Sequence, residues 1–195
     1  MFTTENLILR GFDDGDLEGL LALGNDPLVQ RTQTYSAVAP PPSSKYKEHV
    51  KTFAEGKALW FSLVPKESGQ FIGFSCINLL EAKNRDGRLS ISIASDVWGK
   101  GYGTEAMRFT VNHAFKYFGL QRVSLEVTEG NARARAVYAK LGFKVEGRKR
   151  RGNWIDGHWE DIISMGVLDD EWAELYPESC HTFGESTLAD SWRLH

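Results

Sequence analysis

Residues 88–118 read RLSISIASDVWGKGYGTEAMRFTVNHAFKYF, and this stretch decides the fold. Residues 88–94 alternate between apolar side chains and small or hydroxylic ones, which is the two-residue period of a half-buried strand. The later residues place apolar side chains at three- and four-residue steps, the pattern of an amphipathic helix. The stretch therefore predicts a strand, a short glycine-bearing turn and a long helix.

The turn between strand and helix reads WGKGYG, residues 98–103. Gly101 and Gly103 have no Cβ, so a ligand can approach their backbone where the first helical turn leaves N–H groups unpaired. Those amides, the helix dipole and the charge of Lys100 together suit a diphosphate. The alternative is a turn that uses glycine only for its shape, and two glycines alone do not decide between them.

The same glycines also fit the fingerprint of a dinucleotide-binding Rossmann unit. A parallel Rossmann strand is covered on both faces and is nearly continuously apolar, whereas this strand alternates with serines. The motif also begins a hundred residues into the chain, after a loop longer than the tight first turn of that fold. A Walker P-loop is excluded because the sequence contains no GxxxxGK[ST].

Composition limits the class of protein. The 195 residues suffice for one domain with a substantial core. The net charge of −3, from 23 basic and 26 acidic residues, predicts no strong attraction to nucleic acid or to an anionic membrane. Cys76 and Cys180 cannot form a dense disulfide framework, and the first residues contain no signal-peptide run. We expect a cytoplasmic protein without a metal site, since the histidines and cysteines show no ligand spacing.

Periodicity along the chain predicts one α+β domain with a mixed sheet. Strands are expected at residues 6–12, 58–64, 71–80, 88–94, 123–127, 143–150 and 158–167. Helices are expected at residues 13–25 and 45–55, after the central turn, at 132–141, and from 169. The stretch after Asp26-Pro27 is irregular, and Pro40 to Pro42 form a stiff connector.

A second motif makes the prediction specific. Residues 122–143 read RVSLEVTEGNARARAVYAKLGF, with an asparagine and then a tyrosine seven residues later before Lys-x-Gly-Phe. This pattern resembles the C-terminal half of the GNAT acetyltransferase core, and VWGKGYGTEA resembles the pyrophosphate loop of that superfamily. TTENLILRGF near the start and DGHWEDIISMGVLDDEW near the end resemble the branch of ribosomal-protein N-terminal acetyltransferases of the RimJ/RimL kind.

The resemblance implies a GNAT fold, in which helices flank a mixed and mostly antiparallel central sheet. It implies one domain over residues 1–176, followed by a tail at 177–195. It also implies acetyl-CoA as the donor, and a homodimer is an expectation at the level of the family.

The resemblance further assigns roles to individual residues. The strand end Ser92-Ile93-Ala94 would pair with the pantetheine arm like an added strand, if the neighbouring strands splay after Ala94. Asn131 would contact the same arm, and Tyr138 would act as general acid for the leaving thiolate. The diphosphate would meet the turn, at Lys100, Gly101, Tyr102, Gly103 and Thr104.

Each of these residues also has a purely structural interpretation. Asn131 is suited to cap a helix, and Tyr138 to pack in a core. Arg133 and Arg135 either reach the phosphates or form a solvated helix face.

The general base is the least determined role. Many relatives carry a glutamate at the start of the central strand, where this chain has Arg88, which cannot accept a proton. Glu126 is the first candidate because its strand borders the expected thioester, although a solvated edge charge is an equal interpretation. Asp86, Glu81 and His158 are the other candidates.

The predicted reaction is direct attack of a primary amine on the thioester, with a small molecule or a protein N-terminus as acceptor. An α-amine, with a pKa near 7.7 to 8.0, is neutral more often at pH 7 than a lysine-like amine, which favours an amino acid, a peptide or a protein N-terminus over a polyamine. The connector at residues 40–42 and the next helix are expected to wall the acceptor site, and Trp154, His158 and Trp159 either shape it or pack at a sheet edge. A noncatalytic acyl-CoA sensor is the alternative, and a nicotinamide-dependent oxidoreductase is a distant third.

Overall fold

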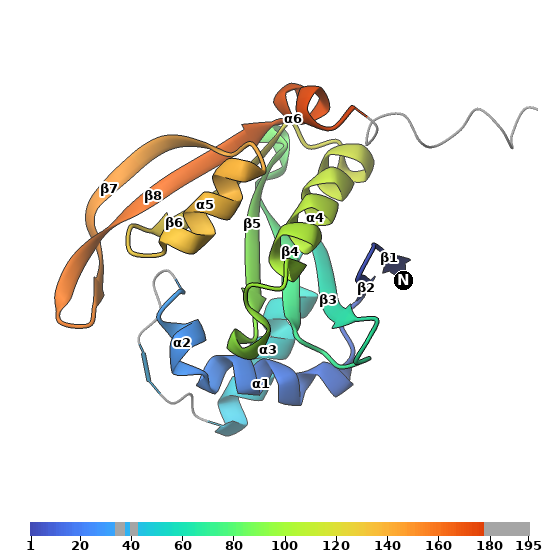
Figure 1. The fold of residues 1–195 in the computed structure, drawn as a ribbon, viewed down its shortest axis with the longest axis vertical. Helices are drawn as coiled ribbons and strands as arrows, with labels where there is room; N and C mark the ends of the chain where they lie inside the picture. The colour runs from blue at the N-terminus through green and yellow to red at the C-terminus, as the bar shows by residue number, and fades with distance from the viewer. Residues whose placement is uncertain (34–37, 40–42, 178–195) are drawn as a thin grey trace, which may run out of the picture.

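The computed structural model describes residues 1–33, 38–39 and 43–177, with the side chains of residues 43–45 left out. The connector at residues 40–42 and the tail beyond 177 therefore lie outside the described residues. Within the described ranges the chain forms one sheet of eight strands in the order β1-β2-β3-β4-β5-β6-β8-β7, flanked by helices (Figure 1). The α+β class is confirmed, and so is a mixed sheet that is antiparallel apart from the pairing of β5 with β6.

The elements follow the predicted order, with the strand β1 and the helix α2 in addition. The strands are β1 (Phe2–Thr3), β2 (Leu7–Arg10), β3 (Leu59–Pro65), β4 (Gly73–Glu81), β5 (Asp86–Ile93), β6 (Arg122–Thr128), β7 (Lys144–Ile155) and β8 (His158–Leu168). The α-helices are α1 (Leu17–Asn25), α2 (Pro27–Gln30), α3 (Ser43–Glu55), α4 (Tyr102–Phe118), α5 (Ala132–Lys140) and α6 (Asp169–Leu175). Short 3-10 turns are η1 (Asp14–Asp16), η2 (Ala82–Asn84) and η3 (Ser95–Val97).

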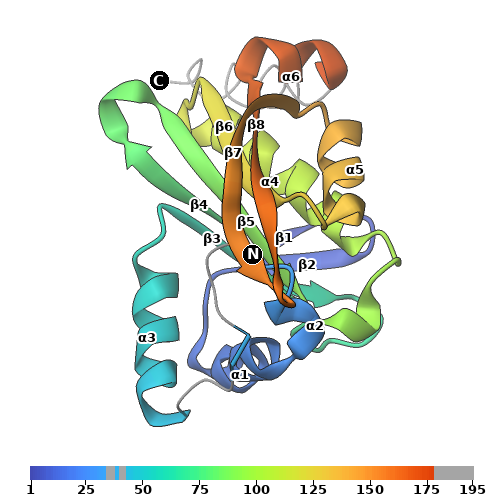
Figure 2. The same ribbon diagram turned by 90° about the vertical axis from the view of Figure 1, so that its left-hand side faces the viewer.

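Two helical layers cover the sheet, as Figure 2 shows with α3 and α4 on opposite sides. The alternation predicted in β5 separates them, because Leu89, Ile91 and Ile93 belong to the apolar cluster under α4. A second cluster joins α1, α2 and α3 to Trp60 of β3 and Cys76 of β4. Ser90 and Ser92 face this second side, where they line a cavity.

A buried ion pair fixes the start of α1 to the sheet. Asp16 is 1% exposed, and its carboxylate accepts hydrogen bonds from Arg10 at 2.6 and 2.8 Å and from the Ser62 hydroxyl at 2.7 Å. Burial acts to raise the pKa of Asp16, but the bonds from Arg10 and Ser62 outweigh it and hold that pKa below its usual value. The α1 helix is thereby tied to both β2 and β3.

Two parts of the prediction needed correction. The irregular stretch after Asp26 contains α2, in which the Asp26 carboxylate caps the helix by accepting from the N–H of Leu28 at 2.8 Å and Pro27 occupies the first turn. The strand expected to end at residue 150 continues to Ile155 with two irregularities in its pairing to β8. Among the described helices, none is long and apolar enough to cross a membrane.

Candidate active site

The site is a gap between two parallel strands that pair over only three positions. The β5–β6 register ends at Arg88↔Ser124, whereas β5 stays paired with β4 as far as Ile93 and β6 stays paired with β8 as far as Thr128. Each strand therefore follows its outer neighbour as the sheet twists. The sequence predicted that the two strands separate after Ala94, but β5 and β6 already separate directly after Arg88.

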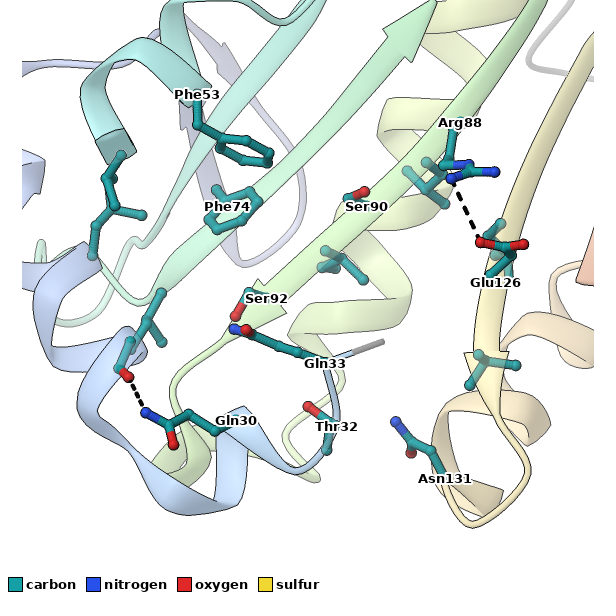
Figure 3. A pocket seen from close by; sticks show the side chains of 18 of the residues that line it. Gln30, Thr32, Gln33, Phe53, Phe74, Arg88, Ser90, Ser92, Glu126 and Asn131 are labelled. Atoms are coloured by element: carbon teal, nitrogen blue, oxygen red, sulfur yellow. Dashed lines mark hydrogen bonds and ion pairs between the residues drawn. The ribbon is translucent and has the colours of Figure 1, made fainter. Parts of the chain in front are cut away.

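Two cavities occupy this gap. The larger has a volume of about 710 Å³ and the smaller about 300 Å³. Both are lined by the same five residues, which mark their junction: Thr32, Ile91, Ser92, Asn131 and Tyr138. Figure 3 shows the wider part, with Arg88, Ser90 and Ser92 along β5 and with Phe53 and Phe74 on one side of that strand and Glu126 and Asn131 on the other.

The glycine turn and the start of α4 line the smaller cavity. Gly101 has a φ of 88°, which an L side chain rarely adopts, and a Cβ at this position would meet no atom within 4 Å. Gly101 is also the N-cap of α4, and within the described chain no side chain caps this helix end. The first-turn amides of Tyr102, Gly103 and Thr104 are therefore available to an anion.

The side chains next to these amides point elsewhere. The Tyr102 ring is buried in the apolar cluster, and its hydroxyl donates to Glu67 at 2.8 Å. Lys100 is exposed and, in the described structure, lines neither cavity. Lys100 therefore does not contribute a side chain to this part of the cavity wall.

The end of β5 presents alternate backbone groups to the gap. The Ala94 N–H donates to Ile72 O at 2.8 Å, which places the backbone groups of Ala94 on the β4 side. Ile91 and Ile93, of opposite parity, direct theirs towards the gap. The Ile93 carbonyl already accepts from Trp98 Nε1 at 2.8 Å, so Ile91 is the residue whose backbone is least engaged there.

One buried polar atom at the junction supports the presence of a ligand. The Ser92 Oγ is buried and has no hydrogen-bond partner among the described residues. A buried hydroxyl without a partner is costly, and a bound amide or carbonyl would satisfy it. Together with the uncapped α4 terminus, this atom fits the pantetheine and diphosphate groups of an acyl-CoA.

A cation–aromatic contact forms part of the wall of the smaller cavity. The Arg133 guanidinium lies 3.7 Å from the centre of the Trp98 ring, and both residues line the cavity. Arg135, two residues further along α5, donates instead to the carbonyl of Glu129 at 3.2 Å. The structure therefore places Arg133, but not Arg135, in the wall of the smaller cavity.

Asn131 and Tyr138 lie on one short helix at the junction. The Asn131 side chain accepts from the Ala134 N–H at 3.1 Å, so it does cap α5, and it also lines both cavities. Tyr138 packs against the main apolar cluster, and burial raises the pKa of its phenol to about 12. The phenol is therefore protonated at neutral pH and can donate a hydrogen bond.

Of the four candidate bases, Glu126 alone lines a cavity in the described structure. Its Oε2 lies 3.5 Å from Arg88 Nη1, with the two side chains 22% and 43% exposed respectively. Asp86 is held instead by Ser124 and Arg122, and His158 lies beside Glu160. Glu81 is exposed at the end of β4.

The larger cavity also contains residues that sequence reasoning did not select. Gln30 is the last residue of α2, Thr32 and Gln33 follow this helix, and His49 lies on α3. The Asp-Pro helix start at residues 26–27 was the available signal for α2. The α3 helix was expected to wall the acceptor site, and it does line the cavity through Tyr46, His49, Val50 and Phe53.

The tip of the final hairpin does not shape either cavity, as far as the described residues go. Trp154 and Trp159 are 58% and 52% exposed and form an edge-to-face pair with ring centres 5.1 Å apart. This placement favours the second of the two interpretations given above, packing at a sheet edge. No group of three or more metal-ligating side chains occurs in the described ranges. Burial raises the pKa of the Cys76 thiol to about 12.

Comparisons with known proteins agree with this geometry. A family model described as an acetyltransferase (GNAT) domain matches residues 6–144. The chain is 28% identical over 185 residues to a Bacillus subtilis protein named ribosomal N-acetyltransferase YdaF, covering 88% of this chain and 98% of the relative. It is 25% identical over 175 residues to the spermidine N(1)-acetyltransferase of Escherichia coli, covering 88% and 91%.

Solved structures show the same fold. The spermidine N-acetyltransferase of Vibrio cholerae, in complex with CoA and spermine, superposes with a TM-score of 0.73 at 21% identity, covering 87% of this chain and 99% of that one.

Proposed function

Because the chain belongs to the GNAT acetyltransferase family, whose donor is acetyl-CoA, we propose that the smaller cavity binds acetyl-CoA and the larger one binds the acceptor amine. The observation that carries this proposal is the junction, where Ser92, Asn131 and Tyr138 line both cavities. Two substrates that share one wall can react directly, without a covalent enzyme intermediate.

Acetyl-CoA supplies an acetyl group activated as a thioester. The amides of Tyr102, Gly103 and Thr104 would hold its diphosphate, with Arg133 beside them. Ile91, Ser92, Ile93 and Asn131 would hold the pantetheine arm at the gap. Ala94 and Lys100 would contribute only through the shape of the turn, since their groups face away from the cavities.

Tyr138 supplies a proton at the junction. The acceptor amine forms a C–N bond with the acetyl carbon, the C–S bond breaks, and the departing sulfur takes up the proton of the Tyr138 hydroxyl. The amine releases its own proton to Glu126 or to water, and a proton returned through solvent restores the Tyr138 hydroxyl for the next turnover. An α-amine near pKa 8 needs less help from a base than a lysine-like amine, which suits a site whose carboxylate is paired with Arg88.

The test is release of free CoA from acetyl-CoA across a panel of amino acids, peptides, polyamines and aminoglycosides. Release clearly above background with one class supports the proposal. Absence of release with every class, including cell extract as acceptor, contradicts it. The cytoplasmic location, the homodimer and the boundary of the domain at residue 176 stay predictions.

A further inference from the structure

We propose that the acceptor is an amine that carries both an apolar group and a carboxylate, such as an aromatic or branched amino acid or a short peptide beginning with one. This inference rests on the proposed function and names the substrate class of the larger cavity. It is carried by the distribution of charge and aromatic surface over the walls of that cavity.

The charges in the larger cavity do not suit a polycation. Among its described lining residues Glu126 is the only carboxylate, and Arg88 lies 3.5 Å from it. A polyamine carries several positive charges, each of which needs a partner when it leaves water. One carboxylate beside a guanidinium cannot supply them.

The same pair of charges complements an acceptor with one charge of each sign. The Arg88 guanidinium has five N–H donors in a planar fork, and the Glu126 contact engages it through Nη1. A carboxylate on the acceptor can therefore bind the remaining donors by charge-assisted hydrogen bonds. The amine then lies on the Glu126 side, towards Tyr138.

An apolar wall faces this pair across β5. Phe74 stacks on Trp60 with ring centres 4.4 Å apart, and Phe53 meets the same Phe74 ring at 6.1 Å. Leu20, Leu23 and Val50 continue the wall, and all of them line the cavity. Because Phe74 is held by two neighbouring rings, the wall is formed in advance and suits an aromatic or branched side chain.

The positions along β5 set the size of the acceptor. Arg88 and Ser92 are four residues apart, which is about 13 Å between their Cα atoms in an extended strand. The amine has to reach the junction at Ser92 while the carboxylate reaches the Arg88 side chain. A dipeptide spans more of this distance than a free amino acid, so the two sources of the same chemistry can be told apart experimentally.

Calorimetry with the CoA complex tests the inference by measuring acceptor binding in the absence of acetyl transfer. CoA lacks the acetyl group, so L-phenylalanine, the dipeptide Phe-Ala, its C-terminal amide, Gly-Ala and spermidine can each be titrated as unreactive ligands. We expect Phe-Ala to bind about ten- to a hundredfold more tightly than its amide, the range of a charge-assisted hydrogen bond. Phe-Ala should also bind at least about tenfold more tightly than Gly-Ala, which lacks the aromatic group.

Arg88→Gln should remove the difference between Phe-Ala and its amide while leaving CoA binding unchanged. Arg108→Gln, an exposed arginine on α4 that lines neither cavity, is the matched control and should keep the difference. Equal affinities of the acid and the amide for the parent protein, tighter binding of spermidine, or no binding of Phe-Ala would each overturn the inference.

Turnover with acetyl-CoA separates this inference from the proposed function. Acetylation of spermidine but of neither phenylalanine nor Phe-Ala would overturn the acceptor class and leave the acetyltransferase function in place. Binding of Phe-Ala that depends on Arg88, with no acetyl transfer to any amine, would support the acceptor class and overturn the function.

Discussion

The two cavities on either side of Ser92 are built in different ways. Most of the smaller one is formed by a single stretch of chain, from the end of β5 to the first turn of α4, and the uncapped start of α4 offers backbone amides there. The larger one is formed by residues from α1, α2, the segment after α2, α3, β4, β5, β6 and α5. A backbone site of this kind suits a ligand that is the same throughout a family, whereas a side-chain site can vary with the acceptor.

The largest effect is expected at the junction. Tyr138→Phe removes the proposed proton donor and should lower kcat by a hundredfold or more, the usual worth of general acid catalysis. Acetyl-CoA affinity should stay within about twofold, because the ring itself remains. Steady-state kinetics and calorimetry measure the two quantities. Tyr117→Phe is the control, because Tyr117 is an exposed residue of α4 that lines neither cavity. An unchanged kcat in Tyr138→Phe would remove Tyr138 from the mechanism.

The next effect concerns the wall of the larger cavity. Asp16→Asn removes the charge of the buried carboxylate at the start of α1 and should lower the free energy of unfolding by about 1 to 3 kcal/mol, because the Arg10 side chain left behind is 32% exposed. Asp14→Asn, which breaks the exposed ion pair with Lys51, should cost less than about 1 kcal/mol. Urea denaturation compares the two variants, and equal losses would contradict the role given to Asp16.

The same carboxylate predicts a pH dependence. The pKa of Asp16 is lowered in the folded state, so its stabilisation is present above the unfolded carboxyl pKa of about 3.9 and is lost as the pH falls through the folded value. The parent should therefore lose more stability between pH 7 and acid than Asp16→Asn does. An equal loss of the free energy of unfolding in the two proteins over this pH range would contradict the prediction.

A smaller effect is expected at the glycine turn. Gly101→Ala and Gly157→Ala both place an L side chain at positive φ, 88° and 80°, with open space around the new Cβ. Each should lose roughly 1 to 2 kcal/mol of stability from the same backbone strain. Only Gly101→Ala should also weaken acetyl-CoA binding, by about tenfold, since it shifts the first-turn amides of α4. Equal acetyl-CoA affinities in the two variants would place the diphosphate elsewhere.

The smallest effect is expected at the rim of the smaller cavity. Arg133→Gln removes the contact with Trp98 and a positive charge beside the turn, and should weaken acetyl-CoA binding about two- to fivefold. Arg135→Gln should change it less, because Arg135 is directed at the Glu129 carbonyl. Calorimetry on both variants tests the distinction, and a larger loss with Arg135→Gln would reverse it.

The difference between the cavities also explains what sequence could predict. The alternation of β5, the glycines of the turn and the amphipathic α4 are local patterns, and each confirmed element can be found within one window of sequence. Thr32, Gln33 and His49 reach the larger cavity only through the packing of α2 and α3 against the sheet, so no local pattern marks them. The point of splay after Arg88 depends on how β5 and β6 follow β4 and β8, which is a property of the whole sheet.

A crystal structure of the protein with CoA is the most direct test of the claim that the smaller cavity binds the donor and the larger cavity binds the acceptor. We predict that the diphosphate lies against the amides of Tyr102, Gly103 and Thr104, and that the thiol lies at the junction beside Ser92 and Tyr138, with the larger cavity left open to the acceptor. CoA bound along Phe53, Phe74 and Arg88 instead, with the glycine turn free of it, would contradict the account.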